Sequence, residues 1–216
     1  MAFSGWPDEA LTFYEELEAD NSKSYWTAHK AIYDQAVLAP MTELIEELAA
    51  VIGGEPKIFR PYRDIRFSRD KTPYKTHIGA TIGSRSYVQF SADGLGAGAG
   101  RWHLDPEPLA RYRAGVAGPA GAELEVIVAA IEKAGIELHG HNALKSAPRG
   151  YPADHQRIGL LRYKGLTSWQ QWTPGPWLAT PEGKDLVLEF LRASAPLVDW
   201  LDGHVGLGGD QDSLAG

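Results

Sequence analysis

The dipeptide Asp93-Gly94 constrains the fold of this chain more than any other feature, because it is the strongest short β-hairpin signal in the sequence. Residues 86–92 before it and residues 95–103 after it are predicted strands. A further strand is predicted over residues 76–82, followed by a turn at Gly83-Ser84. Three consecutive strands joined by short turns predict an antiparallel meander.

The strand predicted after this turn contains a glycine stripe. In an extended backbone Gly96, Gly98 and Gly100 all fall on one face of the sheet. A face without side chains lets another group lie flat against it, and a closely packed helix is favoured over a bound ligand. The spacing G-x-G-x-G, with no helix opening directly after it, differs from a dinucleotide-binding fingerprint.

Helical signals lie on both sides of the predicted meander. On its amino-terminal side, apolar spacing predicts a helix over residues 8–19, and Asn21 or Ser22 offers an N-cap for a second one. Pro40 predicts a break before a third helix over residues 41–52.

On the carboxyl-terminal side, helix starts recur. The sequence Asp105-Pro106-Glu107 begins one helix, and a second follows over residues 119–133. Residues 136–145 are a short predicted strand, and Asp154 is a predicted cap for a helix that bears Ile158, Leu160 and Leu161. Thr180-Pro181-Glu182 begins the last helix, which is predicted to bend near Pro196 and end by Gly203.

These elements predict an α+β fold, with a mainly antiparallel sheet and helices packed on it. We expect a single domain over residues 1–205, because no linker-like stretch divides it. The domain would comprise amino-terminal helices (8–52), a sheet core (57–103), and further helices with a second basic motif (105–205). Residues 206–216 are a predicted flexible tail.

The composition excludes several classes of chemistry. The 216 residues include no cysteine, which removes disulfides, cysteine zinc sites and thiolate nucleophiles. No segment approaches the ~20 apolar residues of a membrane-spanning helix, and the first residues lack the pattern of a signal peptide. We therefore expect a soluble, cytoplasmic protein with no membrane partner.

Residues 60–77 carry the main functional signal. They contain six Arg or Lys residues and two Asp residues, although the whole chain has a net charge of −7. A helix would crowd Arg60, Arg63, Arg66 and Arg69 together, so a strand is favoured up to residue 67, with a loop over residues 68–75. On that strand Arg60 and Arg66 would share one face and Arg63 would point the other way.

A second basic motif follows later in the chain, with Arg149 and Lys164 as its candidate ligand-binding members. If the two basic segments converge, they would form a pocket for the phosphate or carboxylate of a small molecule. Tyr74 could add a hydroxyl, and Asp64 could orient an arginine or act as a base. The predicted pocket therefore consists of Arg63, Asp64, Arg66, Lys71, Tyr74, Lys75, Arg149 and Lys164.

Two other functions fit the same residues. The basic middle of the chain, with Tyr62, Tyr74 and the tryptophans as stacking groups, could bind RNA or DNA. The acidic overall balance, with an isoelectric point near 5.5, disfavours this. Alternatively the protein is structural, and acidic residues within the chain pair with its arginines. These alternatives leave open whether the protein is an enzyme, and its catalytic residues and oligomeric state are unassigned.

Metal and cofactor signals are weak. His139 and His141 form H-x-H, which in a strand points both imidazoles to one face. A metal site would need a third ligand such as His77, His103 or His155, and nothing nearby in the sequence supplies one. Signatures of serine hydrolases, nucleotide-binding loops and zinc proteases are absent from the sequence. We expect no metal and no cofactor.

The run R-D-I-R-F-S-R-D-K-T-P-Y-K-T, residues 63–76, resembles the signature of a conserved hypothetical protein family called domain of unknown function 2461. The resemblance continues through Phe3, Gly5, Pro7, Asn21 and Pro40. It continues after the meander through Pro106, Leu109 and Arg113, and then through the passage P-R-G-Y-P-A-D-H, residues 148–155. It therefore covers nearly the whole chain and implies no particular activity.

Overall fold

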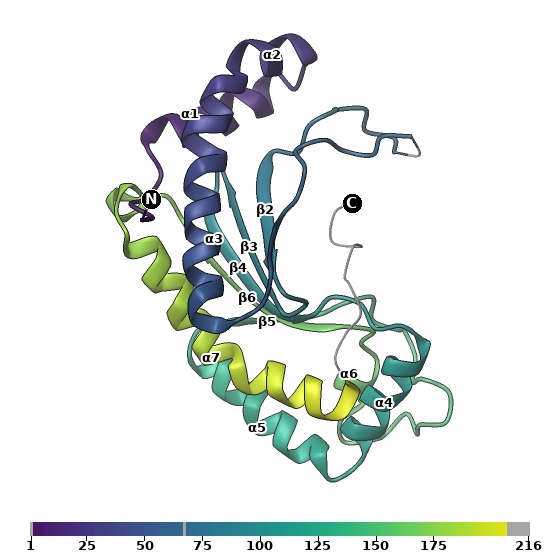
Figure 1. Ribbon diagram of the computed structural model, residues 1–216. Helices are drawn as coiled ribbons and strands as arrows, with labels where there is room; N and C mark the ends of the chain where they lie inside the picture. Colours follow the sequence, from purple (N-terminus) through teal and green to yellow (C-terminus); the bar gives the residue numbers. More distant parts are fainter. Residues whose placement is uncertain (1, 67, 207–216) are drawn as a thin grey trace. The chain divides into compact units, whose positions relative to one another are not determined.

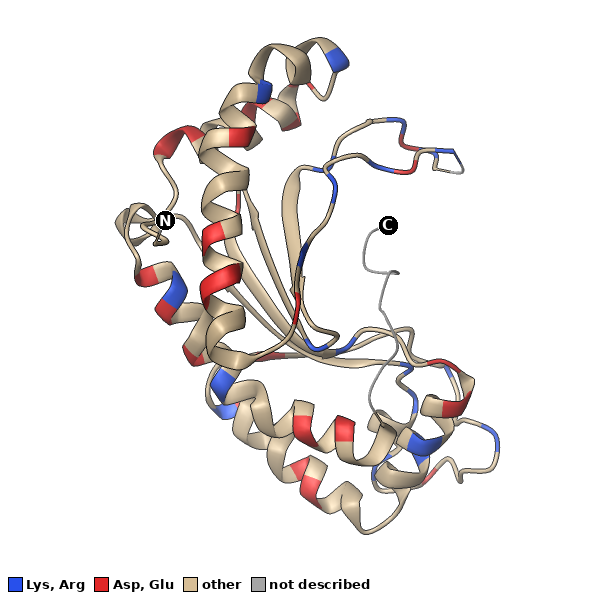
Figure 2. Cartoon of the chain, viewed as in Figure 1, with Lys and Arg blue, Asp and Glu red and all other residues tan. Residues whose placement is uncertain are grey.

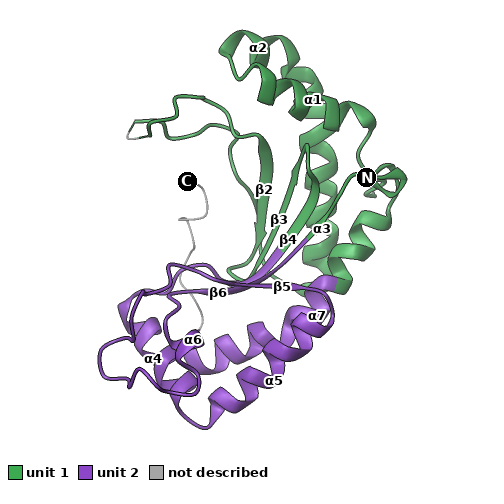
Figure 3. Cartoon of the chain, turned by 180° about the vertical axis from the view of Figure 1, so that it is seen from behind, with its two compact units in different colours: residues 1–97, 171–189, 212–216 green, residues 98–170, 190–211 purple. Residues whose placement is uncertain are grey.

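The computed structural model of the protein describes residues 2–66 and 68–206 (Figure 1). Among these residues the chain divides into two compact units (Figure 3). Unit 1 holds residues 2–97 and 171–189, and unit 2 holds residues 98–170 and 190–206. The expected single domain stays a prediction. Residues 207–216 of the expected flexible tail lie outside the described residues.

The strands form a six-stranded sheet in the order β1-β2-β3-β4-β6-β5, and the predicted α+β class is confirmed. β4 and β6 each begin in one unit and end in the other. The strands are β1 Pro56–Ile58, β2 His77–Ile82, β3 Ser86–Ser91, β4 Gly94–Arg101, β5 Glu137–Gly140 and β6 Leu166–Trp172.

The predicted meander is confirmed to within about two residues at each boundary. β2 and β3 are antiparallel, with His77 opposite Ser91 and Ala80 opposite Val88. Gly94 in the turn has φ +97°, a left-handed conformation that favours glycine. Ile78 and Phe90 are buried on one face of this hairpin, so the alternation of side chains leaves His77 and Gln89 on the other.

Helices of unit 1 cover the apolar face of this hairpin, with α3 packed against β1 and β2 (Figure 1). The predicted break at Pro40 is wrong. The chain stays helical through α2 Lys23–Ile32, the π-helix η1 Tyr33–Leu38 and α3 Ala39–Ile52, after α1 Asp8–Ala19. Pro40 is the second residue of α3 and follows η1 directly, so the missing N–H of the proline falls where the helix changes from π- to α-helical hydrogen bonding.

The strand predicted through the arginines is also wrong. β1 ends at Ile58, and residues 59–76 form an irregular excursion, which we call the basic loop, closed by a β-bridge between Tyr62 and Tyr74. The side chain of Asp64 accepts a hydrogen bond from the backbone N–H of Arg66, a local turn that competes with strand pairing. The facing predicted for Arg63 and Arg66 on a strand therefore does not apply, and Phe67 lies outside the described residues.

Unit 2 contains α4 Pro106–Ala117, α5 Ala120–Lys133 and α6 Ile158–Leu161. The starts of α4 and α5 confirm the predictions, whereas Asp154 does not cap α6, whose N-cap residue is Arg157. The last helix, α7 Glu182–Val205, begins in unit 1 and ends in unit 2. Its last residue, Val205, lies two residues beyond the predicted end at Gly203. Unit 1 also has a short 3-10 helix, η2 Pro176–Ala179.

No single helix among the described residues has the length and apolar composition needed to cross a membrane. The pair α4 and α5, bent by 89°, passes this test only when its two helices are counted together.

Candidate functional site

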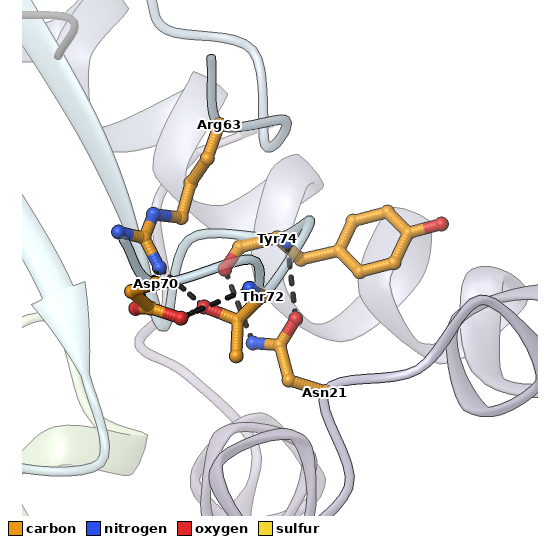
Figure 4. Close-up of polar contacts among 5 residues, drawn as sticks. All are labelled: Asn21, Arg63, Asp70, Thr72 and Tyr74. Carbon is orange, nitrogen blue, oxygen red and sulfur yellow. Dashed lines mark hydrogen bonds and ion pairs between the residues drawn. The ribbon is translucent and has the colours of Figure 1, made fainter. Parts of the chain in front are cut away.

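The basic loop of unit 1 contains its own acidic partners. Arg63 donates to Asp70 and Thr72, and these contacts are drawn in Figure 4. Arg66 Nη2 lies 2.6 Å from Asp64 Oδ2. Figure 2 shows basic and acidic segments alternating along this loop. Hydrogen bonds from the two arginines lower the pKa values of Asp64 and Asp70 to about 2, so both carboxylates are ionised at neutral pH.

The base of the basic loop is fastened to the amino-terminal helices. The Asn21 side chain accepts from the Tyr74 N–H at 3.0 Å and donates to the Tyr74 carbonyl at 3.1 Å (Figure 4). The Tyr74 ring stacks on Trp26, with the ring centroids 4.3 Å apart. Ser22, and not Asn21, caps α2 by accepting from the Tyr25 N–H. Sequence reasoning offered Asn21 only as a cap and missed this tether.

The predicted ligand residues of this loop differ in their surroundings. Lys71 is exposed, and its Nζ donates to the Ile65 carbonyl at 2.8 Å. Arg60 and Arg69 are also exposed. Tyr74 is buried in the aromatic cluster around Trp26, where burial raises the pKa of its hydroxyl.

A basic cluster lies where the loop returns to the sheet, formed by Arg60, Lys75 and His77. Lys75 is only 7% exposed, and its Nζ lies 5.6 Å from the centroid of the Phe59 ring. Burial, with a smaller contribution from the charge of Arg60, lowers the pKa of Lys75 below its usual value. Burial and then the charge of Lys75 lower the pKa of His77. We call these three residues the basic cluster.

The β2–β3 hairpin, which contains His77 of the basic cluster, carries further polar groups. His77 lies opposite Ser91, and Gly79 lies opposite Gln89, whose side chain accepts a hydrogen bond from Tyr87 at 3.1 Å. A Cβ at Gly79 would come within 2.5 Å of the Tyr87 hydroxyl oxygen, so the absence of a side chain there lets the phenol lie over the strand. The hairpin thus presents hydroxyl, amide and imidazole groups on the face opposite its apolar side chains.

The second predicted motif lies in unit 2. Arg149 is exposed, and Lys164 is half-buried with its backbone N–H donating to the His141 carbonyl at 2.8 Å. Arg157, by contrast, is held by Glu125 at 2.8 Å. Because Arg149 and Lys164 belong to one unit and the other six predicted ligand residues to the other, the convergence of the two motifs stays a prediction.

The two histidines of the H-x-H motif lie close together in unit 2, as the alternation in a strand predicts. Their ring centroids are 6.3 Å apart. His139 Nε2 lies 2.9 Å from Glu137 Oε2, and His141 Nε2 lies 2.7 Å from Thr167 Oγ1. Across residues 2–66 and 68–206 no group of three His, Asp or Glu residues could hold a metal ion, so the third ligand considered from the sequence is not found.

Protein stability is expected to fall as the pH drops from 6.5 towards 4, because the folded protein favours the neutral form of the half-buried His141. Burial, then the nearby His139, lower the pKa of His141 from 6.5 to about 4. The unfolded chain therefore binds more protons in this window, and the stabilisation present above pH 6.5 is lost as the pH falls. Allowing for the half-exposed ring, we expect a loss of about 1–2 kcal/mol.

Urea unfolding at pH 7.5, 6 and 5 measures this loss. The variant His141→Gln should show a shallower dependence on pH than the wild type, with a remainder from His77, whose pKa is lowered in the same direction. Equal slopes for the two proteins would contradict the assignment to His141.

Comparison with curated proteins and comparison with solved structures each gave no match. A family model described as conserved hypothetical protein (DUF2461) matches residues 9–200, which span the basic loop, the basic cluster and the second basic motif. This chain therefore belongs to the conserved hypothetical protein family DUF2461.

Proposed function

We propose that the protein binds a small molecule bearing a phosphate or carboxylate group, and that the basic cluster of unit 1 holds this group. The observation that carries the proposal is the burial of Lys75 beside another cationic side chain, Arg60. Both burial and a neighbouring positive charge oppose the charged form of an ammonium group. An anion bound at this place would reverse both effects.

Contacts from these residues to an anion are strong enough to support binding. A hydrogen bond from a charged donor to an anion contributes about 1.5–3 kcal/mol. Two or three such bonds from Arg60 and Lys75 would support binding in about the millimolar to micromolar range.

The basic loop offers further cationic groups to the same ligand. The Arg66–Asp64 and Arg63–Asp70 pairs involve exposed carboxylates, and such pairs contribute about 0–1 kcal/mol each. A bound phosphate or carboxylate could therefore replace Asp64 or Asp70 as a partner at small cost. The tether from Asn21 to Tyr74 fixes the base of the loop directly beside Lys75.

Isothermal titration calorimetry with inorganic phosphate, citrate and adenosine triphosphate tests the proposal. We expect at least one of these probes to bind the wild type, and Lys75→Met to weaken that binding about 10- to 100-fold, as the loss of one charge-assisted hydrogen bond predicts. Lys133→Met, which removes the same charge from an exposed position on α5, is the matched control and should bind as the wild type does.

Two results would overturn the proposal. One is the absence of binding by all three probes, and the other is equal affinity in the Lys75→Met and Lys133→Met proteins. A melting curve for each variant shows whether it folds. If Lys75→Met fails to fold, Arg60→Gln, at an exposed position, serves as the second variant and carries the same expectation. Binding of single-stranded RNA without any of the small anions would instead support the nucleic-acid alternative.

A further inference from the structure

A second group of polar and aromatic side chains lies on β5 and β6 and belongs to unit 2, whereas the basic cluster belongs to unit 1. In the antiparallel register Glu137 is opposite Trp169 and His139 is opposite Thr167. Directly opposed residues point to the same face of a sheet, and alternation along the chain adds His141 to that face. We call this set, together with Trp102, the tryptophan face.

Trp102 lies at one end of the tryptophan face. Its ring packs on His141, with the ring centroids 3.8 Å apart and the planes inclined by 36°. The hydrogen bond between His141 Nε2 and Thr167 Oγ1 fixes the imidazole beneath the indole. Trp102 nevertheless remains 46% exposed, so a large aromatic surface faces solvent on a support that is held in place.

Trp169 lies at the other end and explains part of the glycine stripe. A Cβ at Gly98 would lie 3.2 Å from the Trp169 ring, so the indole packs against the bare backbone of β4 at Gly98. The group that covers Gly98 is thus a side chain from the neighbouring strand, whereas the sequence favoured a helix. Glu137, opposite Trp169, and His141, beneath Trp102, are four residues apart, which is about 13 Å along a strand.

We propose that the tryptophan face binds a neutral carbohydrate of several rings. One face of a sugar ring carries C–H groups, which match the electron-rich face of an indole, and its edge carries hydroxyls that both donate and accept hydrogen bonds. Beside the two indoles this face carries a carboxylate, two imidazoles and a hydroxyl, from Glu137, His139, His141 and Thr167. Aromatic surface with a few convergent polar groups is the usual composition of a small-molecule site.

The charges of the tryptophan face favour a neutral ligand over a nucleic acid. Sites for single-stranded nucleic acids combine stacking aromatics with Lys and Arg side chains that follow the phosphates. The opposed positions of β5 and β6 on this face supply a carboxylate at Glu137 and no Lys or Arg. The lowered pKa of His141 keeps that imidazole uncharged at neutral pH, so it can hydrogen-bond a hydroxyl without attracting an anion.

Calorimetric titration of the full chain with maltotetraose, cellotetraose and chitotetraose tests the proposal. We expect at least one tetrasaccharide to bind, Trp102→Ala to lower its affinity at least tenfold, and Trp102→Phe to recover part of the loss. Tyr62→Ala is the matched control, because Tyr62 is an aromatic residue of unit 1 that is 47% exposed, and it should leave the affinity unchanged.

Three outcomes would overturn the assignment: no binding by any tetrasaccharide, equal affinity in the Trp102→Ala and Tyr62→Ala proteins, or binding of a single-stranded oligothymidylate in place of the sugars. If Trp102→Ala does not fold, Glu137→Gln replaces it, since Glu137 is exposed and its carboxylate is expected to accept from a sugar hydroxyl. A Glu137→Gln protein with wild-type affinity would then count against the proposal. The anion titrations use different variants, so either proposal can fail alone.

Discussion

Replacing Asp202 by alanine is expected to lower the free energy of unfolding by about 3–5 kcal/mol, the usual cost of removing one partner of a buried ion pair. Arg101, at the end of β4, is 2% exposed, and its Nη2 lies 2.5 Å from Asp202 Oδ1 on α7. Without this carboxylate, the guanidinium would lose a charged partner in a place that water does not reach.

Urea unfolding of Asp202→Ala, followed by circular dichroism, measures the effect. Asp199→Ala is the matched control, because Asp199 is an exposed residue on the same helix, and its replacement should change stability by less than about 0.5 kcal/mol. The double variant Arg101→Met/Asp202→Leu should lose less stability than Asp202→Ala, since it leaves no buried charge. Equal losses for Asp199→Ala and Asp202→Ala would show that the pair contributes little.

The sequence predicted the regular elements of this fold well, because they depend on local signals. Asp93-Gly94 specified a hairpin, and Asp105-Pro106-Glu107 specified the start of α4. Pro40 misled, because the sequence did not reveal the π-helix directly before it, through which the chain stays helical. β6 was missed because its residues, LTSWQQW, lack a clear alternation of apolar and polar side chains.

The candidate sites were predicted less completely, because they depend on contacts between distant segments. The abundance of Arg and Lys in residues 60–77 identified the basic loop and Lys75. It did not show that Asp64 and Asp70 pair with Arg66 and Arg63, nor that Asn21 holds Tyr74. The tryptophan face joins three segments whose members lie 26 to 67 residues apart, and only the alternation of His139 and His141 was visible in the sequence.

The same dependence on distant contacts makes Gly100 the second position where a small change should have a large effect. Gly100 has φ +127°, a backbone conformation that residues with a Cβ rarely adopt. A Cβ at this position would overlap the Leu166 carbonyl oxygen and lie 3.0 Å from the Thr167 Cα. Both neighbours are backbone atoms of β6, so neither can rotate away as a flexible side chain could.

We therefore expect Gly100→Ala to destabilise the protein by about 3 kcal/mol or more, from backbone strain and the overlap together. Gly203→Ala, on α7 with nothing within 4 Å of the new Cβ, is the control, and it should be neutral or stabilise by up to about 1 kcal/mol. Urea unfolding of both variants decides the matter, and a Gly100→Ala protein as stable as Gly203→Ala would contradict this account of the β4–β6 pairing. Thr167 holds His141 beneath Trp102. Gly100→Ala should therefore also lower the affinity of the tryptophan face for a tetrasaccharide, whereas Gly203→Ala should leave that affinity unchanged.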